Sequence, residues 1–228
     1  DRIHLFDTPL LMCRNQGLSM EQRAAKRVLD IIVSGLGIIV SSPIMLIIAI
    51  AVKAYDGGPV FYLQDRLTYQ GKEFRIRKFR SMCVDSEKNG ARLASKHDSR
   101  ITPVGHVLRN LHLDELPQLF NVFMGDMSLV GPRPERDVIM QEYEQEIPEF
   151  HYRLKVKAGL TGYAQVYGKY NTTPYDKLKL DLFYIENYSF LLDIKLLFMT
   201  VKIFFQKEVS EGVDDNQKNA LKDSEDKK

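Results

Sequence analysis

The sequence predicts a mostly helical α/β protein with a small β element, held at a membrane by a re-entrant helix hairpin and by surface amphipathic helices. In such a monotopic membrane protein the hairpin enters and leaves one leaflet. An apolar run over residues 28–52 contains one charged residue, Asp30. It is long enough to cross a bilayer core, which takes about 20 apolar residues. After it, helical patterns alternate with short strand patterns and glycine-rich turns.

The centre of the apolar run contains Ser41, Ser42 and Pro43. Proline removes a helix hydrogen bond and clashes with the preceding turn, whereas a serine hydroxyl can bond a carbonyl that has lost its partner. Basic residues flank both ends of the run, which fits poorly with a simple crossing: Arg23, Lys26, Arg27, Lys53, Arg66, Lys72 and Arg75. We therefore expect a hairpin that breaks at Ser42 and Pro43. A kinked helix that spans the bilayer is the alternative.

Composition narrows the class of protein. The 228 residues are enough for one good-sized domain with an appendage, and 32 Lys plus Arg against 30 Asp plus Glu do not indicate a nucleic-acid binder. Cys13 and Cys83 stand far apart without a CxxC pattern, so neither a disulfide framework nor a zinc site is expected, and a reducing compartment fits best. The chain begins with Asp1 and shows no signal-peptide pattern, so we expect part of a longer protein.

Local patterns place the remaining elements. Strands are expected over 60–64 and within 72–82, where Phe74 and Ile76 alternate with basic residues that would form one positive face. Helices are expected from near Asp114 to just before Gly125, over 134–147, and twice within 174–205 with a break near 187–189. The glycine-rich segment 158–171 reads as a loop or hairpin. The very apolar segment 190–205 suits a helix at the membrane surface, with a core helix as the alternative.

The stretch LHLDELPQL, residues 111–119, places Asp114 and Glu115 side by side ahead of Pro117. We expect Asp114 to be the N-cap of a helix, where backbone N–H groups lack partners and proline is tolerated in the first turn. A helix N-terminus favours anions and lowers carboxylate pKa values, so both acids are expected to be ionised near a bound phosphate. The structural alternative is an ordinary helix cap.

Cationic residues surround this pair in the sequence. The loop GPRP, residues 131–134, holds Arg133 between two prolines, and arginine binds phosphate oxygens in a bidentate fork. Lys78, Arg80 and Arg109 can converge from elsewhere. A carboxylate among cations suits phosphorus chemistry, in which the acid attacks or binds a metal and the cations offset phosphoryl charge. A stiff loop and a basic strand that binds anionic lipid headgroups are the non-catalytic alternatives.

Ordered motifs from Lys26 to Phe205 resemble those of the bacterial sugar transferases, the monotopic polyprenyl-phosphate hexose-1-phosphate transferases (phosphoglycosyl transferases). The shared motifs are KRVLDIIVSGLGIIVSSP, GPVFYLQDR, KFRSM, RITPVG, LDELPQLFNVFMGDMSLVGPRPE, GLTGYAQV and DLFYIENYSFLLDIK. The opening residues look like the connector of the family's large members. The resemblance implies a connector over 1–25, a re-entrant helix over 26–55, a cytoplasmic catalytic domain over 56–206, and a disordered polar tail over 207–228.

The activity implied by this resemblance is transfer of a sugar 1-phosphate from a UDP-sugar to undecaprenyl phosphate with Mg²⁺, which releases UMP. It would be the first membrane step of exopolysaccharide, capsule or O-antigen synthesis, at the cytoplasmic face of the bacterial inner membrane. A direct single displacement and a non-catalytic membrane-anchored assembly protein are the alternatives. The sequence leaves the sugar and the oligomeric state open, a homodimer included.

The resemblance also implies roles for individual residues. Asp114 would be the nucleophile that forms a phosphosugar-aspartyl intermediate, and Glu115 its partner at the Mg²⁺. Ser42 and Pro43 would form the break in the membrane helix. The substrate- and phosphate-binding set would be Lys78, Arg80, Arg109, Arg133, Gln165 and Asp193. Two departures from the family pattern are Tyr163, where tryptophan is common, and YGKY in place of NGR, which leaves the role of Lys169 open.

Overall fold

The computed structural model describes residues 3–5, 8–10, 18–84, 98–168 and 172–204 of the chain. Its strands are β1 (Ile3–Leu5), β2 (Thr8–Leu10), β3 (Phe61–Leu67), β4 (Glu73–Phe79), β5 (Ser128–Val130) and β6 (Gly159–Thr161). Its α-helices are α1 (Met20–Asp56), α2 (Pro103–Asn110), α3 (Gln118–Met124), α4 (Asp137–Glu146), α5 (Tyr163–Tyr167), α6 (Pro174–Glu186) and α7 (Phe190–Phe204). Short 3-10 turns are η1 (Tyr69–Gly71), η2 (Leu113–Glu115) and η3 (Pro148–Lys155). The prediction of a mostly helical protein with a small β element is confirmed.

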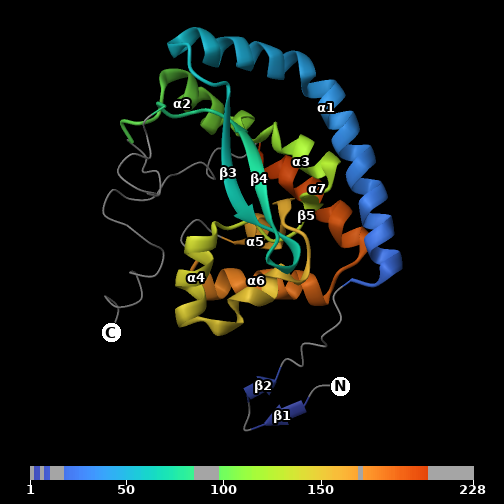
Figure 1. Cartoon of the computed structure of the whole chain (residues 1–228). Coiled ribbons are helices and arrows are strands. Elements are labelled where there is room, and N and C mark those ends of the chain that lie inside the picture. Colours follow the sequence, from blue (N-terminus) through green and yellow to red (C-terminus); the bar gives the residue numbers. More distant parts are fainter. Residues whose placement is uncertain (1–2, 6–7, 11–17, 85–97, 169–171, 205–228) are drawn as a thin grey trace.

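Helix α1 curves along one side of the molecule and over its top (Figure 1). It begins at a capping box in which Ser19 Oγ accepts from the backbone N–H of Gln22, and the Gln22 side chain accepts from the N–H of Ser19. It ends at Gly57, whose φ of 68° lies in the left-handed region that favours glycine. Within the described residues, α1 alone is long and apolar enough to cross a membrane.

The helix continues through Pro43, so the two helices of the expected hairpin form one element in this structure. Pro43 has no N–H to donate to the carbonyl of Ile39. Ser42 Oγ donates to that carbonyl instead at 2.8 Å, and Ser41 Oγ donates to the carbonyl of Gly37 at 2.6 Å. The Ser42 hydroxyl thus occupies the carbonyl that Pro43 leaves without a donor, and α1 remains helical where the sequence predicts a break.

The first arm of α1, residues 20–40, packs on the domain through buried polar contacts. Lys26 Nζ lies 2.5 Å from Asp193 Oδ2 of α7, and both side chains are buried. Asp30 Oδ1 accepts from Ser128 Oγ at 3.0 Å and from the backbone N–H of Leu129 at 2.9 Å. The single charge in the apolar run therefore faces β5 and not lipid.

The second arm of α1, residues 44–56, packs on the same domain through apolar contacts. Met45, Ile48 and Val52 form a buried cluster with Phe79 of β4 and Leu108 of α2. The outward side of both arms is rich in exposed apolar side chains: Val28, Ile32, Leu36, Ile39, Val40, Leu46, Ile47 and Ile50. A membrane-attached helix accounts for such a surface, because soluble monomers rarely expose apolar patches of this extent.

The antiparallel hairpin of β3 and β4 confirms both predicted strands, and it pairs Phe61 with Phe79 at one end. Phe74 and Ile76 are buried and Arg75 is exposed, as the alternation predicts. The expectation that Lys78 belongs to the same positive face as Arg75 is wrong. Lys78 lies on the same side of β4 as Phe74 and Ile76, because strand side chains alternate with a period of two residues.

The glycine-rich segment 158–171 is not the expected loop or hairpin over its described part. It contains β6, which pairs in parallel with β5 through Ser128 and Gly159 and through Val130 and Thr161, and then α5. Near the end of this strand pair the two backbones lie so close together that a Cβ on Gly159 would lie 2.1 Å from the backbone nitrogen of Gly131. Three residues that pair with a strand far away in the chain leave no local pattern, so the sequence could not reveal β6.

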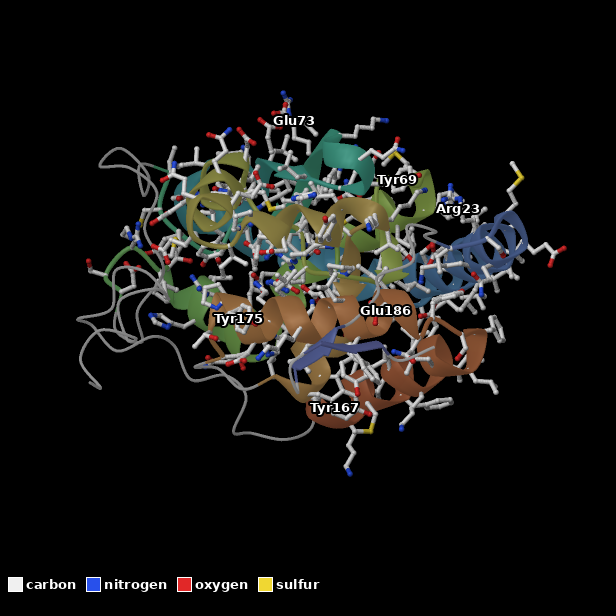
Figure 2. All side chains as sticks on the ribbon, turned by 90° about the horizontal axis from the view of Figure 1, so that it is seen from below. Arg23, Tyr69, Glu73, Tyr167, Tyr175 and Glu186 are labelled. Carbon is white, nitrogen blue, oxygen red and sulfur yellow. The ribbon has the colours of Figure 1, made fainter. Side chains whose placement is uncertain are left out.

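The helices of the C-terminal part, α6 and α7, confirm the expected pair with its break after Glu186. One face of α7 lies in the core, where Asp193 and Leu196 are fully buried. The opposite face exposes Leu191, Phe198 and Val201, at 76%, 73% and 55% of their surface. The prediction of a core helix is confirmed for one face of α7, and the opposite face is the exposed apolar surface that the membrane-surface alternative requires. In the views of Figures 1 and 2, α7 runs beside the first arm of α1.

Three other expectations fall on parts of the chain that the structure leaves out or describes only in part. Cys13, most of the polar segment 85–100, and the expected tail 207–228 lie outside the described residues. The helix predicted over 134–147 is present as α4.

Replacing Lys26 by methionine should destabilise the protein strongly, because the Asp193 carboxylate would stay buried without its cation. Breaking a buried pair costs about 3–5 kcal/mol, whereas replacing both partners is often close to neutral. Thermal unfolding in detergent should therefore show a large loss for Lys26→Met and a smaller one for the double variant Lys26→Met/Asp193→Leu. Equal losses in the two variants would contradict a buried ion pair.

Candidate active site

The two adjacent acids lie in η2, between α2 and α3. His112 precedes this turn with a φ of 52°, in the left-handed region, and Pro117 follows it as the N-cap of α3. The prediction that Asp114 caps the helix is wrong, because α3 begins at Gln118 and Asp114 sits inside the 3-10 turn. The predicted end of the helix is confirmed: Gly125 is its C-cap with a φ of 95°.

Glu115 is the centre of the charged cluster. Its Oε1 accepts a hydrogen bond from Lys78 Nζ at 2.6 Å and another from Arg133 Nη2 at 2.8 Å. Burial by itself would raise the pKa of Glu115, but the charges of Arg133 and Lys78 outweigh it and hold this pKa well below its usual range. In turn Glu115 raises the pKa of Arg133. One carboxylate oxygen thus joins two cations that come from β4 and from the Pro-Arg-Pro loop.

Asp114 has the opposite electrostatic setting. Burial raises the pKa of its carboxyl group, and the attraction of Lys78 and Arg109 offsets this effect only in part. The expectation that a helix start lowers the pKa of both acids is therefore wrong for Asp114. For Glu115 the lowering is found, but two direct cation partners cause it and a helix cap does not. A carboxyl with a raised pKa is more basic, and the ionised form of such a group is a stronger nucleophile.

The Pro-Arg-Pro loop is fixed through its backbone. The carbonyl of Pro132 accepts from the N–H of Gly159 at 2.9 Å, and that of Glu135 accepts from the N–H of Leu67 at 3.0 Å. A Cβ on Gly131 would lie 2.4 Å from the carbonyl oxygen of Lys157, so only glycine fits there. These contacts hold the loop against β3 and β6 and leave the side chain of Arg133 directed at Glu115.

The other expected binding residues are distributed differently. Arg109, in the last turn of α2, acts on Asp114 electrostatically. Arg80 forms a two-bond ion pair with Asp56 and donates to the carbonyl of Pro59 at 2.7 Å, so it connects β4 to the end of α1. Asp193 is engaged with Lys26 in the buried pair.

Gln165 lies in α5, behind the Pro-Arg-Pro loop. Its Nε2 donates to the carbonyl of Leu160 at 3.1 Å, and its Oε1 is buried without a hydrogen-bond partner among the residues that the structure describes. A Cβ on Gly162 would lie 2.6 Å from this Oε1 and 2.2 Å from the carbonyl of Gly131. The amide of Gln165 thus faces the same tight turn that supports the loop.

Sequence reasoning missed Asn121, which connects β4 to α3, the helix that follows the Asp114–Glu115 dyad. Its Nδ2 donates to the carbonyl of Arg75 at 2.8 Å, and its Oδ1 accepts from the N–H of Arg77 at 3.0 Å. The Asn121 side chain therefore bonds to the backbone of β4 as a neighbouring strand would, and these bonds end at Arg77, the residue before Lys78. The available signal was a polar residue of low helix propensity within an otherwise apolar helical pattern.

The carboxylates can be tested as magnesium ligands from their chemistry. The described residues contain no group of three or more His, Cys, Asp or Glu side chains that could hold a metal ion by itself. Mg²⁺ is commonly bound by one or two carboxylates together with substrate phosphates and water. Asp114 and Glu115 supply two adjacent carboxylates beside two phosphate-binding cations, so the residues fit an ion that binds together with a diphosphate.

Comparison with known proteins shows the family to which the chain belongs. Residues 21–207 match the family model described as bacterial sugar transferase. The UDP-N-acetylgalactosamine-undecaprenyl-phosphate N-acetylgalactosaminephosphotransferase of Aeromonas hydrophila is 44% identical over 180 residues, which cover 78% of this chain and 43% of that protein. The UDP-glucose:undecaprenyl-phosphate glucose-1-phosphate transferase of Klebsiella pneumoniae is 44% identical over 204 residues, covering 87% and 42%. The undecaprenyl-phosphate galactose phosphotransferase of Salmonella typhimurium is 38% identical over 222 residues, covering 90% and 46%.

A half-buried carboxyl, that of Asp114, lies beside an ionised glutamate that binds lysine and arginine. With the match over residues 21–207, the chain belongs to the bacterial sugar transferase family. It spans less than half the length of the three relatives named above.

Glu115→Ala should lower the Tm, because Lys78 and Arg133 would face each other without the carboxylate between them. Added pyrophosphate should then raise the Tm of this variant more than that of the wild type, since the anion replaces the missing carboxylate. A gain of about 1 kcal/mol corresponds to about 2–4 °C for a domain of this size. The matched control is Glu73→Ala, at an exposed glutamate on the outer surface (Figure 2). The same pyrophosphate shift in all three proteins would contradict the assignment.

Proposed function

We propose that this protein transfers a sugar 1-phosphate from a UDP-sugar to undecaprenyl phosphate and releases UMP. The observation that carries the proposal is the arrangement of Asp114 beside the Lys78–Glu115–Arg133 cluster in a member of this family. The relatives' names include UDP-N-acetylgalactosamine and UDP-glucose as donors and undecaprenyl phosphate as acceptor. The Asp114 carboxyl would supply the nucleophile, and the two cations would supply the charge that a diphosphate requires.

The proposed reaction has two displacements. In the first, an Asp114 Oδ attacks the phosphorus that carries the sugar, the bond from this phosphorus to the bridging oxygen breaks, and UMP leaves with the electron pair. In the second, a phosphate oxygen of undecaprenyl phosphate attacks the same phosphorus. The bond to Asp114 then breaks, which restores the carboxylate and forms the undecaprenyl-diphosphate sugar. Each step conserves charge and requires no oxidant or reductant.

The surrounding groups have separate roles in this scheme. Lys78 and Arg133 lie where they can neutralise the phosphoryl oxygens as negative charge develops on them. Glu115 keeps these two cations together and would provide a carboxylate ligand for Mg²⁺. An Mg²⁺ ion held there would supply positive charge that stabilises the leaving UMP.

The membrane attachment fits a lipid-phosphate acceptor. Both arms of α1 pack on one domain, through the Lys26–Asp193 pair and through the cluster around Phe79. A helix that crossed the bilayer would place its two arms on opposite sides and could not contact the same domain in this way. This supports a monotopic arrangement in which the bend of α1 lets it enter and leave one leaflet at Ser42 and Pro43. Because UDP-sugars are cytoplasmic metabolites, the site would lie at the cytoplasmic face.

Asp114→Asn should abolish UMP release from the UDP-sugar, because an amide cannot form the phosphosugar-aspartyl bond. The activity is measured with a panel of UDP-glucose, UDP-galactose and their N-acetylated forms together with undecaprenyl phosphate, which also identifies the donor. Asp65→Asn is the matched control, because the Asp65 side chain is 68% exposed on β3 and pairs with Arg75. If Asp114→Asn retained turnover, Asp114 would be excluded as the nucleophile.

Incubation of the wild type with donor alone separates two displacements from one. A phosphosugar adduct on the protein, detected by intact mass, is expected when the acceptor is left out. A direct displacement, with Asp114 binding only the metal, gives no adduct. Absence of any nucleotide- and Mg²⁺-dependent thermal shift would instead favour a non-catalytic assembly protein.

The rate of UMP release without acceptor should fall as the pH decreases through a value above the ordinary aspartate pKa of 3.8. Burial raises the pKa of Asp114, so its carboxylate is protonated, and loses its nucleophilic form, at a higher pH than an exposed aspartate. Leaving out the acceptor matters because a phosphate monoester itself titrates near neutral pH. In the control variant Asp65→Asn, the rate of UMP release should fall over the same acidic pH range as in the wild type. A rate independent of pH down to acid unfolding would contradict this assignment.

A further inference from the structure

The backbone of the Pro-Arg-Pro loop is bonded at four successive carbonyl groups. The outer two, at Pro132 and Glu135, accept from backbone N–H groups. The inner two accept from arginines: that of Arg133 accepts from Arg153 Nη2 at 2.9 Å, and that of Pro134 accepts from Arg66 Nη1 at 3.1 Å. The prolines on either side of Arg133 have no N–H groups. Side chains from elsewhere in the fold therefore hold the part of the loop that carries Arg133.

Arg153 makes the more complete set of contacts of the two arginines. It comes from η3 and its side chain is 3% exposed. Its Nε donates to Asp181 Oδ2 of α6 at 2.7 Å, and its Nη1 lies 3.6 Å from Glu135 Oε1. The guanidinium group also lies over the ring of Phe150, 4.7 Å from the ring centre. All three of its nitrogens thus face protein groups.

These contacts leave Arg153 unsuited to bind a substrate directly. Its charge faces two carboxylates, those of Asp181 and Glu135, which are themselves 2% and 12% exposed. Burial by itself would raise the pKa of Glu135, but Lys177 and Arg153 lower it to about 2. Arg153 is therefore part of a buried cluster of charged groups that contacts the loop through its backbone carbonyl groups.

We propose that Arg153 is a positioning residue that sets the Arg133 guanidinium against Glu115 and hence against the donor diphosphate. The proposal rests on the function proposed above. Arg153 bonds to Asp181 of α6 and to the carbonyl of Arg133 in the loop, so it fixes the distance between the loop and α6. Displacements of about 1 Å at a reacting group can cost about 100-fold in rate.

Lysine cannot replace arginine in this role. A guanidinium presents a planar fork whose nitrogens can bond a carboxylate and a carbonyl at the same time, whereas an ammonium group is a single point charge. Arg153→Lys keeps the charge that balances Asp181 and Glu135 but gives up the simultaneous bond to the carbonyl of Arg133. The variant therefore separates positioning from charge.

The test is a double-mutant cycle of Arg153→Lys and Arg133→Ala, with UMP release measured over a range of UDP-sugar concentrations. Each single variant should lower kcat/KM by about 10- to 100-fold. The double variant should match Arg133→Ala within about 2-fold, because Arg153 acts only through the side chain that is already absent. Losses that multiply in the double variant would overturn the proposal. Lys179→Met, at an exposed lysine of α6, is the control and should keep wild-type activity.

A second variant tests the same proposal in case Arg153→Lys does not fold. Asp181→Asn keeps the size of its side chain and weakens the hold on Arg153 Nε, so it should give the same non-additive result with Arg133→Ala. Loss of the folded protein in both variants would assign Arg153 to the core and also overturn the proposal. An inactive wild type would reject the proposed function, whereas an active wild type with multiplying losses would reject only the positioning role.

Discussion

The two hydrogen bonds on Glu115 Oε1 are the interaction on which the site depends. They join Lys78 of β4 to Arg133 of the Pro-Arg-Pro loop, two cations that would repel each other without an anion between them. The carboxylate is ionised because these charges outweigh the effect of burial. Asp114, the next residue, is half-buried with less compensation from cations, and its pKa is raised. Adjacent acids thus have different chemistry, one as a permanent anion and the other as a basic carboxyl.

The rest of the fold maintains the distances around Glu115. Asn121 fixes α3 to the edge of β4, so that the helix after the dyad and the strand with Lys78 keep one register. Arg153 and Arg66 bond the loop backbone from the opposite side. The cluster around Phe79, against which Leu113 and Leu116 pack, places the second arm of α1 directly behind the dyad turn. The long apolar helix and the charged cluster around Glu115 are therefore parts of one packed unit.

Several predictions from local patterns are correct because their causes are local. The strands β3 and β4, the helix pair α6 and α7, and the cap at Gly125 each follow from periodicity or from a glycine at a left-handed position. The serine hydroxyl that takes the carbonyl freed by Pro43 is also local, since Ser42 and Ile39 lie one helical turn apart. The strand β6 was missed because its pairing with β5 depends on residues about 30 positions away.

The sequence by itself determined the helical content, the membrane helix, and the set of acids and cations that marks the family. Only the tertiary structure decided how these charges are paired. Lys78, expected to bind phosphate beside the two acids, lies against Glu115, 37 residues away in the chain. Arg80 and Asp193, which were expected in the same binding set, are paired with Asp56 and Lys26. The physical reason is that a charge in a sequence has no partner until folding brings one within hydrogen-bonding distance, and the cost of burying it alone selects which partner that is.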